Sequence, residues 1–170
     1  MAITQGFTYS CSDSAVGGIS DLWITNTADI TSVTESAGEA TVITFASGKF
    51  WYKVGFEDDG CSFTENVEVT NNRVLYKPEY KIKIGNRKTS ARTFLLALKG
   101  CERLAVVHKE RATNANWMTG YQPTQGLRHL STTQQTGNTI ADENMIEITL
   151  GHPTGVQYPA IVTTATIVTS

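Results

Sequence analysis

The chain has 170 residues and a mass of 18.5 kDa, which fits one domain that buries roughly two thirds of its unfolded surface. A net charge of −2 and a pI of 5.9 argue against tight binding to nucleic acid, which needs clustered Lys and Arg. Only 18% of the residues are charged, as expected for a subunit whose neighbours cover much of its surface.

Cysteines and the N-terminus indicate the compartment. Cys11, Cys61 and Cys101 are odd in number and far apart, so we expect packed thiols rather than disulfides or a zinc site. The N-terminus has no signal-peptide pattern, and no segment is long enough to cross a bilayer. We therefore expect synthesis in the cytoplasm and no membrane anchor.

From residue 22 to 84, short alternating runs of Val, Ile, Thr and aromatic residues predict antiparallel strands separated by turns. In the run 50–57, one face collects four apolar residues, and we expect that face to point into the core. They are Phe50, Tyr52, Val54 and Phe56.

A β-hairpin is the sharpest local prediction. Asn71 and Asn72 suit a two-residue turn, because asparagine tolerates positive φ angles. One face then pairs apolar residues: Val69 with Val74, Val67 with Tyr76, and Phe63 with Tyr80. The reverse face pairs polar residues: Asn66 with Lys77, Thr64 with Glu79, and Ser62 with Lys81. Only Glu65 opposite Pro78 breaks the apolar face.

One helix is predicted over residues 89–99, with Thr89 or Ser90 as the N-cap and Gly100 closing its end. Its apolar stripe consists of Phe94, Leu95 and Leu98, and we expect a packing role without chemistry. Residues 104–108 and 145–150 are predicted as two further strands.

Three segments surround this predicted core within a single domain, 1–170. Residues 1–16 are expected to form an N-terminal arm, and the polar stretch 110–142 a long loop. The uncharged, β-prone stretch 156–170 is expected to be an extension beyond the core. It is interpreted as a strand added to a neighbour's sheet or as the last strand of its own domain, with a frayed terminus less favoured.

Chemical motifs are weak throughout the sequence. His108, His129 and His152 stand in different elements without metal-ligand spacing, and no catalytic context surrounds Cys101 that would make it a partner of His108. The turn 57–60 lacks the alternation of a calcium loop and is interpreted as a solvated acidic turn. We therefore expect no catalytic residue, no cofactor and no metal.

The order of segments resembles a known family. The segments 14–19, 22–26, 30–34, 50–56 and 62–67 are followed by the hairpin, the helix 89–99, and two predicted strands, 104–107 and 116–120. This succession, covering about residues 11–151, resembles the tail tube (major tail structural) proteins of tailed bacteriophages.

The resemblance implies an antiparallel β-sandwich or barrel-like domain with one flanking α-helix. It also implies self-assembly into rings, commonly hexameric, that stack into a tail tube in the virion. Other tail proteins would be partners, DNA would only pass through as cargo, and no catalytic residue is carried over. A lumen that conducts DNA should be neutral or negative, because basic residues would bind the phosphates.

Two sets of residues follow as hypotheses. The candidate lumen-facing residues are Thr64, Asn66, Glu68 and Thr70. Lys77, Lys81 and Lys83 share their face, so either these lysines pair with Glu68 and Glu79, or the face points outward. The candidate subunit-contact residues are Trp117, Tyr121, Tyr158, Ile161 and Val162.

Other functions stay open at this point. The uncharged segment after Val156 has no counterpart in the resemblance and is compatible with a head-to-tail connector or a tube terminator. A carbohydrate-binding module would instead use an aromatic stacking platform, for which the candidates are Trp23, Trp51, Trp117 and Tyr121. A hydrolase of unknown type is the least favoured alternative.

Overall fold

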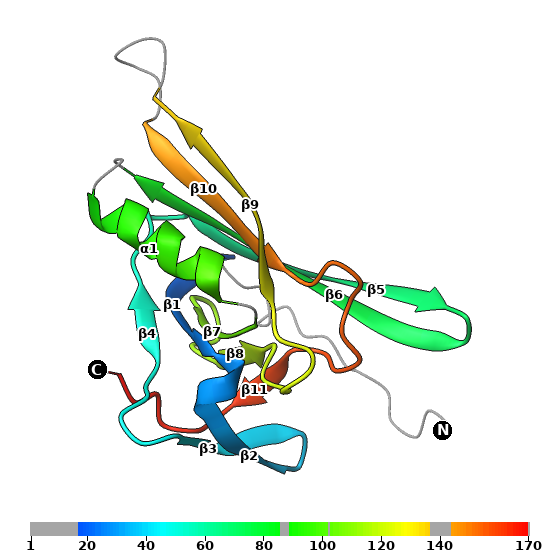
Figure 1. The fold of residues 1–170 in the computed structure, drawn as a ribbon. Helices are drawn as coiled ribbons and strands as arrows, with labels where there is room; N and C mark the ends of the chain where they lie inside the picture. Colours follow the sequence, from blue (N-terminus) through cyan, green and yellow to red (C-terminus); the bar gives the residue numbers. More distant parts are fainter. Residues whose placement is uncertain (1–16, 86–88, 102, 137–143, 170) are drawn as a thin grey trace.

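The computed structural model describes residues 17–85, 89–101, 103–136 and 144–169. Within them the protein is mainly β, with two sheets and one α-helix (Figure 1). The predicted fold class, a β-sandwich-like domain with one flanking helix, is confirmed. Residues 1–16, predicted to form an N-terminal arm, lie outside the described residues.

The larger sheet has seven strands in the order β2-β3-β11-β8-β7-β1-β4. Neighbouring strands are antiparallel except β11 and β3, which run parallel. A short 3-10 helix, η2 (Thr27–Asp29), joins the first two strands. The strands are β1 (Ile19–Asn26), β2 (Ile30–Ser36), β3 (Glu39–Phe45), β4 (Tyr52–Val54), β7 (Leu104–Glu110), β8 (Asn116–Thr119) and β11 (Ile161–Thr163).

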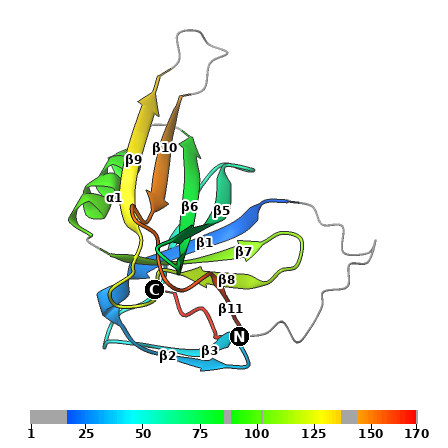
Figure 2. The same ribbon diagram turned by 90° about the vertical axis from the view of Figure 1, so that its right-hand side faces the viewer.

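The smaller sheet has four strands in the order β5-β6-β10-β9, and every neighbouring pair is antiparallel. Figure 2 shows this sheet rising from one side of the larger sheet, with the helix α1 beside it. The strands are β5 (Cys61–Thr70), β6 (Arg73–Gly85), β9 (Arg128–Gln135) and β10 (Met145–Gly151).

The β5–β6 hairpin has the register that the sequence predicts, including Val69 opposite Val74 and Asn66 opposite Lys77. Asn71 and Asn72 have φ angles of 51° and 59°, as the two-residue turn requires. The polar break in the apolar face also has a structural reason. The Glu65 carboxylate accepts a 2.9 Å hydrogen bond from the backbone N–H of Ala160, and burial raises its pKa.

The helix α1 (Thr89–Gly100) is confirmed with the bounds and the apolar stripe that the sequence predicts. Leu98 is buried, and Phe94 and Leu95 pack against the core between the two sheets. The apolar stripe of the helix therefore packs against this core.

Apolar side chains pack on both faces of the seven-stranded sheet. Between the two sheets and under α1, a first core gathers residues such as Leu22, Tyr80, Val106 and Ile148. On the other face, a second core collects Ala40, Trp51, Ala105, Val107, Met118 and Tyr121. Odd-numbered and even-numbered residues of β7 therefore both enter a core, and all five residues from Leu104 to His108 are buried.

The second core corrects the prediction for the run 50–57. Val54 points into the first core opposite Leu22, as expected. Tyr52 shares that face but lies at the sheet edge and exposes 46% of its surface, so its prediction as a core residue is wrong. Trp51 is fully buried because the reverse face, which the sequence suggested to be polar, packs against the second core.

The prediction of a long polar loop over 110–142 is also wrong. This segment contains β8, which was predicted as a strand over 116–120 and lies at the centre of the larger sheet, and β9, the edge strand of the smaller sheet, which was not predicted. Its polarity misled the interpretation because an edge strand such as β9 faces water along most of its length. Residues 137–142 of the segment are not among those described.

The C-terminal segment 156–170 belongs to its own domain. Its strand β11 lies between β3 and β8, and the backbone of Val156 exchanges two hydrogen bonds with Tyr76, of 2.7 and 2.8 Å. Near the chain end, the backbone N–H of Trp51 donates a hydrogen bond to the backbone carbonyl of Val168. Of the two interpretations that the sequence left open, the last strand of the same domain is correct, and the segment is not an extension beyond the core.

Candidate assembly surface

One face of the four-stranded sheet is bare. The first half of β5 alternates between covered and exposed residues, and residues 67–70 are all exposed. The exposed set includes all four candidate lumen residues, Thr64, Asn66, Glu68 and Thr70. The same polar face continues across β10, where Glu147 lies opposite Lys83, and into β9. No described element covers it (Figure 2).

Charges on this polar face are paired across short distances. The Lys77 ammonium contacts the Glu68 carboxylate, and Lys81 lies 3.5 Å from Glu79. The Lys77 contact lowers the pKa of Glu68, with a smaller contribution from the hydroxyl of Thr70. The sequence left open whether these lysines pair or whether the face points outward. Lys77 and Lys81 do pair, whereas Lys83 has no ion pair among the described residues.

Both edges of the smaller sheet are open. Among the described residues, β5 pairs only with β6 and β9 pairs only with β10. Such an edge presents unpaired backbone N–H and C=O groups, which are a template for another strand. Natural monomers usually protect an edge with Lys or Pro. β9 has neither, and it has no charged residue after Arg128.

The predicted subunit-contact residues have unequal access to a neighbour. Tyr121 is buried and donates a 2.9 Å hydrogen bond to Glu35, while Ile161 and Val162 lie within the interior strand β11. Trp117 is half-buried and its indole nitrogen is covered. Tyr158 exposes 50% of its surface and is the best placed of the five for a contact, whose role stays a prediction.

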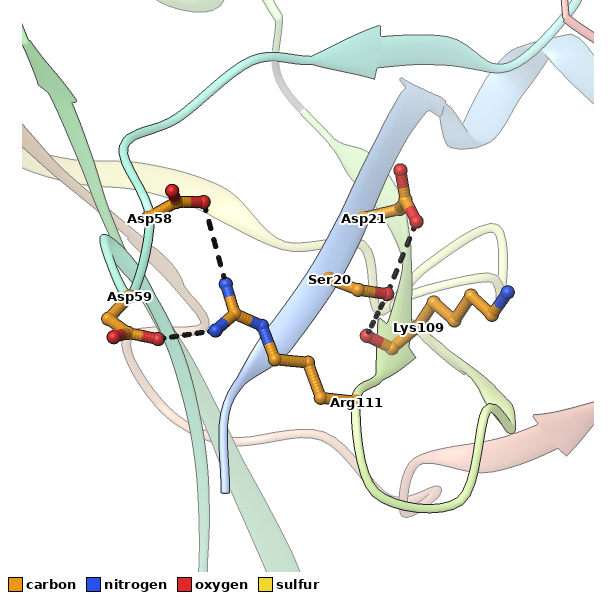
Figure 3. Close-up of polar contacts among 6 residues, drawn as sticks. All are labelled: Ser20, Asp21, Asp58, Asp59, Lys109 and Arg111. Atoms are coloured by element: carbon orange, nitrogen blue, oxygen red, sulfur yellow. Dashed lines mark hydrogen bonds and ion pairs between the residues drawn. The ribbon is translucent and has the colours of Figure 1, made fainter. Parts of the chain in front are cut away.

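The acidic turn is closed by a cation of its own chain. Figure 3 shows the guanidinium of Arg111, just after β7, reaching the carboxylates of Asp58 and Asp59 at 3.8 and 2.6 Å. Beside it, the Ser20 hydroxyl donates to the Lys109 carbonyl at 3.3 Å, which ties β1 to β7. Both aspartates remain exposed, in agreement with a solvated turn.

Several polar side chains meet inside the first core. The Tyr80 hydroxyl lies 2.8 Å from Nδ1 of His108 and 2.5 Å from the Thr119 hydroxyl, inside the first core. Desolvation lowers the pKa of His108 to about 4. Cys101 instead lies after the end of α1, where its thiol donates to the Ala97 carbonyl. No contact joins Cys101 to His108 in the described structure.

The aromatic residues proposed for sugar stacking are also covered. Trp51 and Tyr121 are buried in the second core, and Trp23 and Trp117 are half-buried. A stacking platform needs exposed ring faces, which these four residues do not offer together.

No protein-family model, curated protein or solved structure matches this chain. In the part of the chain that the structure describes, no three His, Cys, Asp or Glu residues are grouped as a metal site would require. Over the same residues, no helix has the length and apolar character to span a membrane. The strongest functional feature of the molecule is therefore the four-stranded sheet with its bare polar face and two open edges.

Proposed function

We propose that the protein is a structural virion subunit that assembles into stacked rings forming a phage tail tube for genome passage. The observation that carries the proposal is the smaller sheet, which packs one face on the core, leaves the other polar and has at each edge a strand whose outer side is without a partner among the described strands. Sheet edges of this kind are satisfied when β9 of one copy pairs with β5 of the next.

Strand direction makes this pairing compatible with rotational symmetry. The four strands alternate in direction, so β5 and β9 run antiparallel to each other within one copy. A rotation about a ring axis preserves strand direction, and it therefore brings β9 next to an antiparallel β5. The joined sheets form one continuous antiparallel barrel, which removes every free edge from the smaller sheet.

The size of such a barrel suits DNA. Six copies of a four-stranded sheet supply roughly two dozen strands, and at about 4.8 Å per strand the wall is about 37 Å across. Side chains on the inner face take about 5 Å from each side, which leaves about 27 Å. Strand tilt widens the barrel further. A DNA double helix passes through an opening of this width.

The chemistry of the polar face supports its assignment to the lumen. As far as Phe63, the apolar face of β5 packs in the first core, so we assign the opposite face, with Thr64, Asn66, Glu68 and Thr70, to the inside of the barrel. Its lysines Lys77 and Lys81 contact carboxylates. A lumen of this kind holds DNA phosphates weakly, because free clustered cations are what bind them.

Two proline variants of β9 test the proposal. Successive N–H groups of a strand point to opposite sides, so one of Thr132→Pro and Thr133→Pro removes a donor from the open edge and the other removes one from the β9–β10 ladder. Thermal unfolding identifies the edge variant as the one that keeps its stability. We expect that variant to stay monomeric in sedimentation and the wild type to form rings or tubes in electron micrographs.

Two results would contradict the proposal. One is a wild-type protein that remains monomeric at every concentration. The other is an edge variant that assembles as well as the wild type. The connector alternative has lost the observation on which it depended, because the uncharged C-terminal segment belongs to the larger sheet.

A further inference from the structure

The far end of the β5–β6 hairpin carries an apolar surface that no described residue covers. We call residues 67–75 the hairpin tip. Val67, Val69 and Val74 share one face of it and expose 61%, 68% and 47% of their surfaces. Three exposed valines on neighbouring positions form a small apolar patch, which is typical of a contact surface.

The hairpin tip extends beyond its own sheet. The last backbone contact on the outer side of β6 is the pair of hydrogen bonds between Tyr76 and Val156. Beyond this point the tip is a two-stranded ribbon, which Figure 1 shows projecting away from the body of the molecule. An isolated ribbon of this kind has little stability of its own and gains from a partner.

A groove of complementary character lies on the same chain. It has a volume of about 330 Å³ and runs between the β1–β4 edge and α1. Its walls include Ile24, Tyr52, Phe94, Leu98, Cys101 and Leu104. The groove is predominantly apolar and large enough to take inserted side chains. We call it the apolar groove.

The two surfaces lie at opposite ends of the smaller sheet. Figure 1 shows α1 at one end of the strands and the hairpin tip at the other. The valines of the tip continue the face of β5 that carries Phe63 into the first core, and the groove lies on that same side of the sheet. A copy displaced along the strand direction therefore presents its groove to the tip of the copy behind it.

We propose that the hairpin tip of each copy occupies the apolar groove of a copy in the next ring and so joins rings head to tail. Contacts between two different surfaces do not close on themselves, and they propagate an assembly along its axis. This inference rests on the proposed function, but it concerns ring stacking, whereas the β5–β9 pairing concerns ring closure.

A cysteine cross-link tests the contact. Cys101 lines the apolar groove, so Val69→Cys should form a disulfide with Cys101 of the next copy. The variant is made in a Cys11→Ser background, and Cys61 is buried. Burial raises the pKa of the Cys101 thiol, and the oxidation is therefore run at alkaline pH. We expect a ladder of covalent multimers in denaturing electrophoresis under non-reducing conditions.

Matched variants define the specificity of this cross-link. Thr70→Cys places the thiol one residue further, on the polar face, and should give no ladder. Adding Cys101→Ser to Val69→Cys should abolish the ladder. Tubes that form without a ladder in Val69→Cys, or a ladder that survives the loss of Cys101, would overturn the proposal.

A charge in the tip gives an independent readout. Val69→Asp should leave the thermal transition of the subunit unchanged, because this side chain is exposed, and should give separate rings instead of tubes. Asn66→Asp adds the same charge on the polar face and should keep the tubes. Val69→Asp tubes as long as those of the wild type would contradict the docking but leave ring formation standing. A wild-type protein that stays monomeric would overturn both proposals.

Discussion

The two sheets of this protein differ in which of their faces are buried. The seven-stranded sheet packs apolar side chains on both faces and takes the C-terminal strand β11 into its interior. The four-stranded sheet buries most of one face and leaves the other polar, and in both sheets each edge strand has a single partner. Both sheets contribute to the first core, and only the larger sheet has a second core, whereas an uncovered polar face is a feature of the smaller sheet.

This difference explains why a sequence of low charge forms a stable subunit and still exposes valines. A folded domain has a net stability of only about 5–15 kcal/mol, so the loss of a few core contacts is enough to unfold it. A surface that binds another copy can leave backbone groups and apolar side chains without partners in the isolated chain. The predictions below compare substitutions in the two sheets, beginning with the largest expected effect.

Removal of a segment from each sheet gives the strongest contrast. Deletion of residues 159–170 removes β11 from between β3 and β8 and should abolish cooperative unfolding of the domain. Replacement of residues 68–75 by Asn-Gly shortens the β5–β6 hairpin outside any core and should preserve the transition. Calorimetry measures both. A truncated chain that unfolds like the wild type would show that β11 is dispensable.

Two neighbouring aromatic residues provide the next contrast. Trp51 is fully buried in the second core, so Trp51→Ala should lower the free energy of unfolding by about 3–5 kcal/mol. Tyr52 is half exposed at the sheet edge, and Tyr52→Ala should cost less than about 1.5 kcal/mol. Denaturant titration of both variants checks the order. Equal losses would contradict the assignment of a second core.

Acid should weaken the contact between the sheets. The folded-state pKa of His108 is lowered to about 4 by desolvation, so the unfolded chain binds its proton first as the pH falls below about 6.5. Stability should be complete above that pH and fall by about 3 kcal/mol between pH 6.5 and 4.

His108→Gln should remove most of this pH dependence in denaturant titrations. A smaller slope should persist, because burial also lowers the pKa of His152. An unchanged slope in His108→Gln would show that other groups cause the loss of stability.

The smallest effect is expected on the polar face of the smaller sheet. Lys81→Gln removes an exposed ion pair with Glu79 and should change the free energy of unfolding by less than about 0.5 kcal/mol. The same substitution leaves the assembly surface uncharged at this position, and tubes should still form. A large loss of stability would show that the face is not bare in the subunit.

Local patterns in the sequence predict the hairpin and the helix. The hairpin register follows from Asn71 and Asn72 together with the alternation of β5 and β6, because a shift by one residue would place every valine on the polar face. The helix follows equally from its run of helix-forming residues and its apolar stripe. In these elements the polarity of each side chain matches its exposure, so the sequence alone predicts which side is buried.

The errors have one physical source. Trp51 and β9 were misassigned because their environment depends on segments distant in the sequence. Trp51 is buried by a core on the second face of its sheet, and β9 pairs only with β10. Of the candidate site, the polar face of β5 was predictable, whereas the open edge at β9 was not, because no local signal marks a strand that lacks a second neighbour.

By itself, the sequence determined the β class, the β5–β6 hairpin and the helix, since these depend on residue spacing and turn chemistry within short windows. Only the tertiary structure decided that β11 lies inside its own domain, that Lys77 and Lys81 contact carboxylates, and which edges stay unpaired. The physical reason is that strand neighbours are chosen by non-local hydrogen bonds and packing, on which the local pattern of residues imposes little constraint.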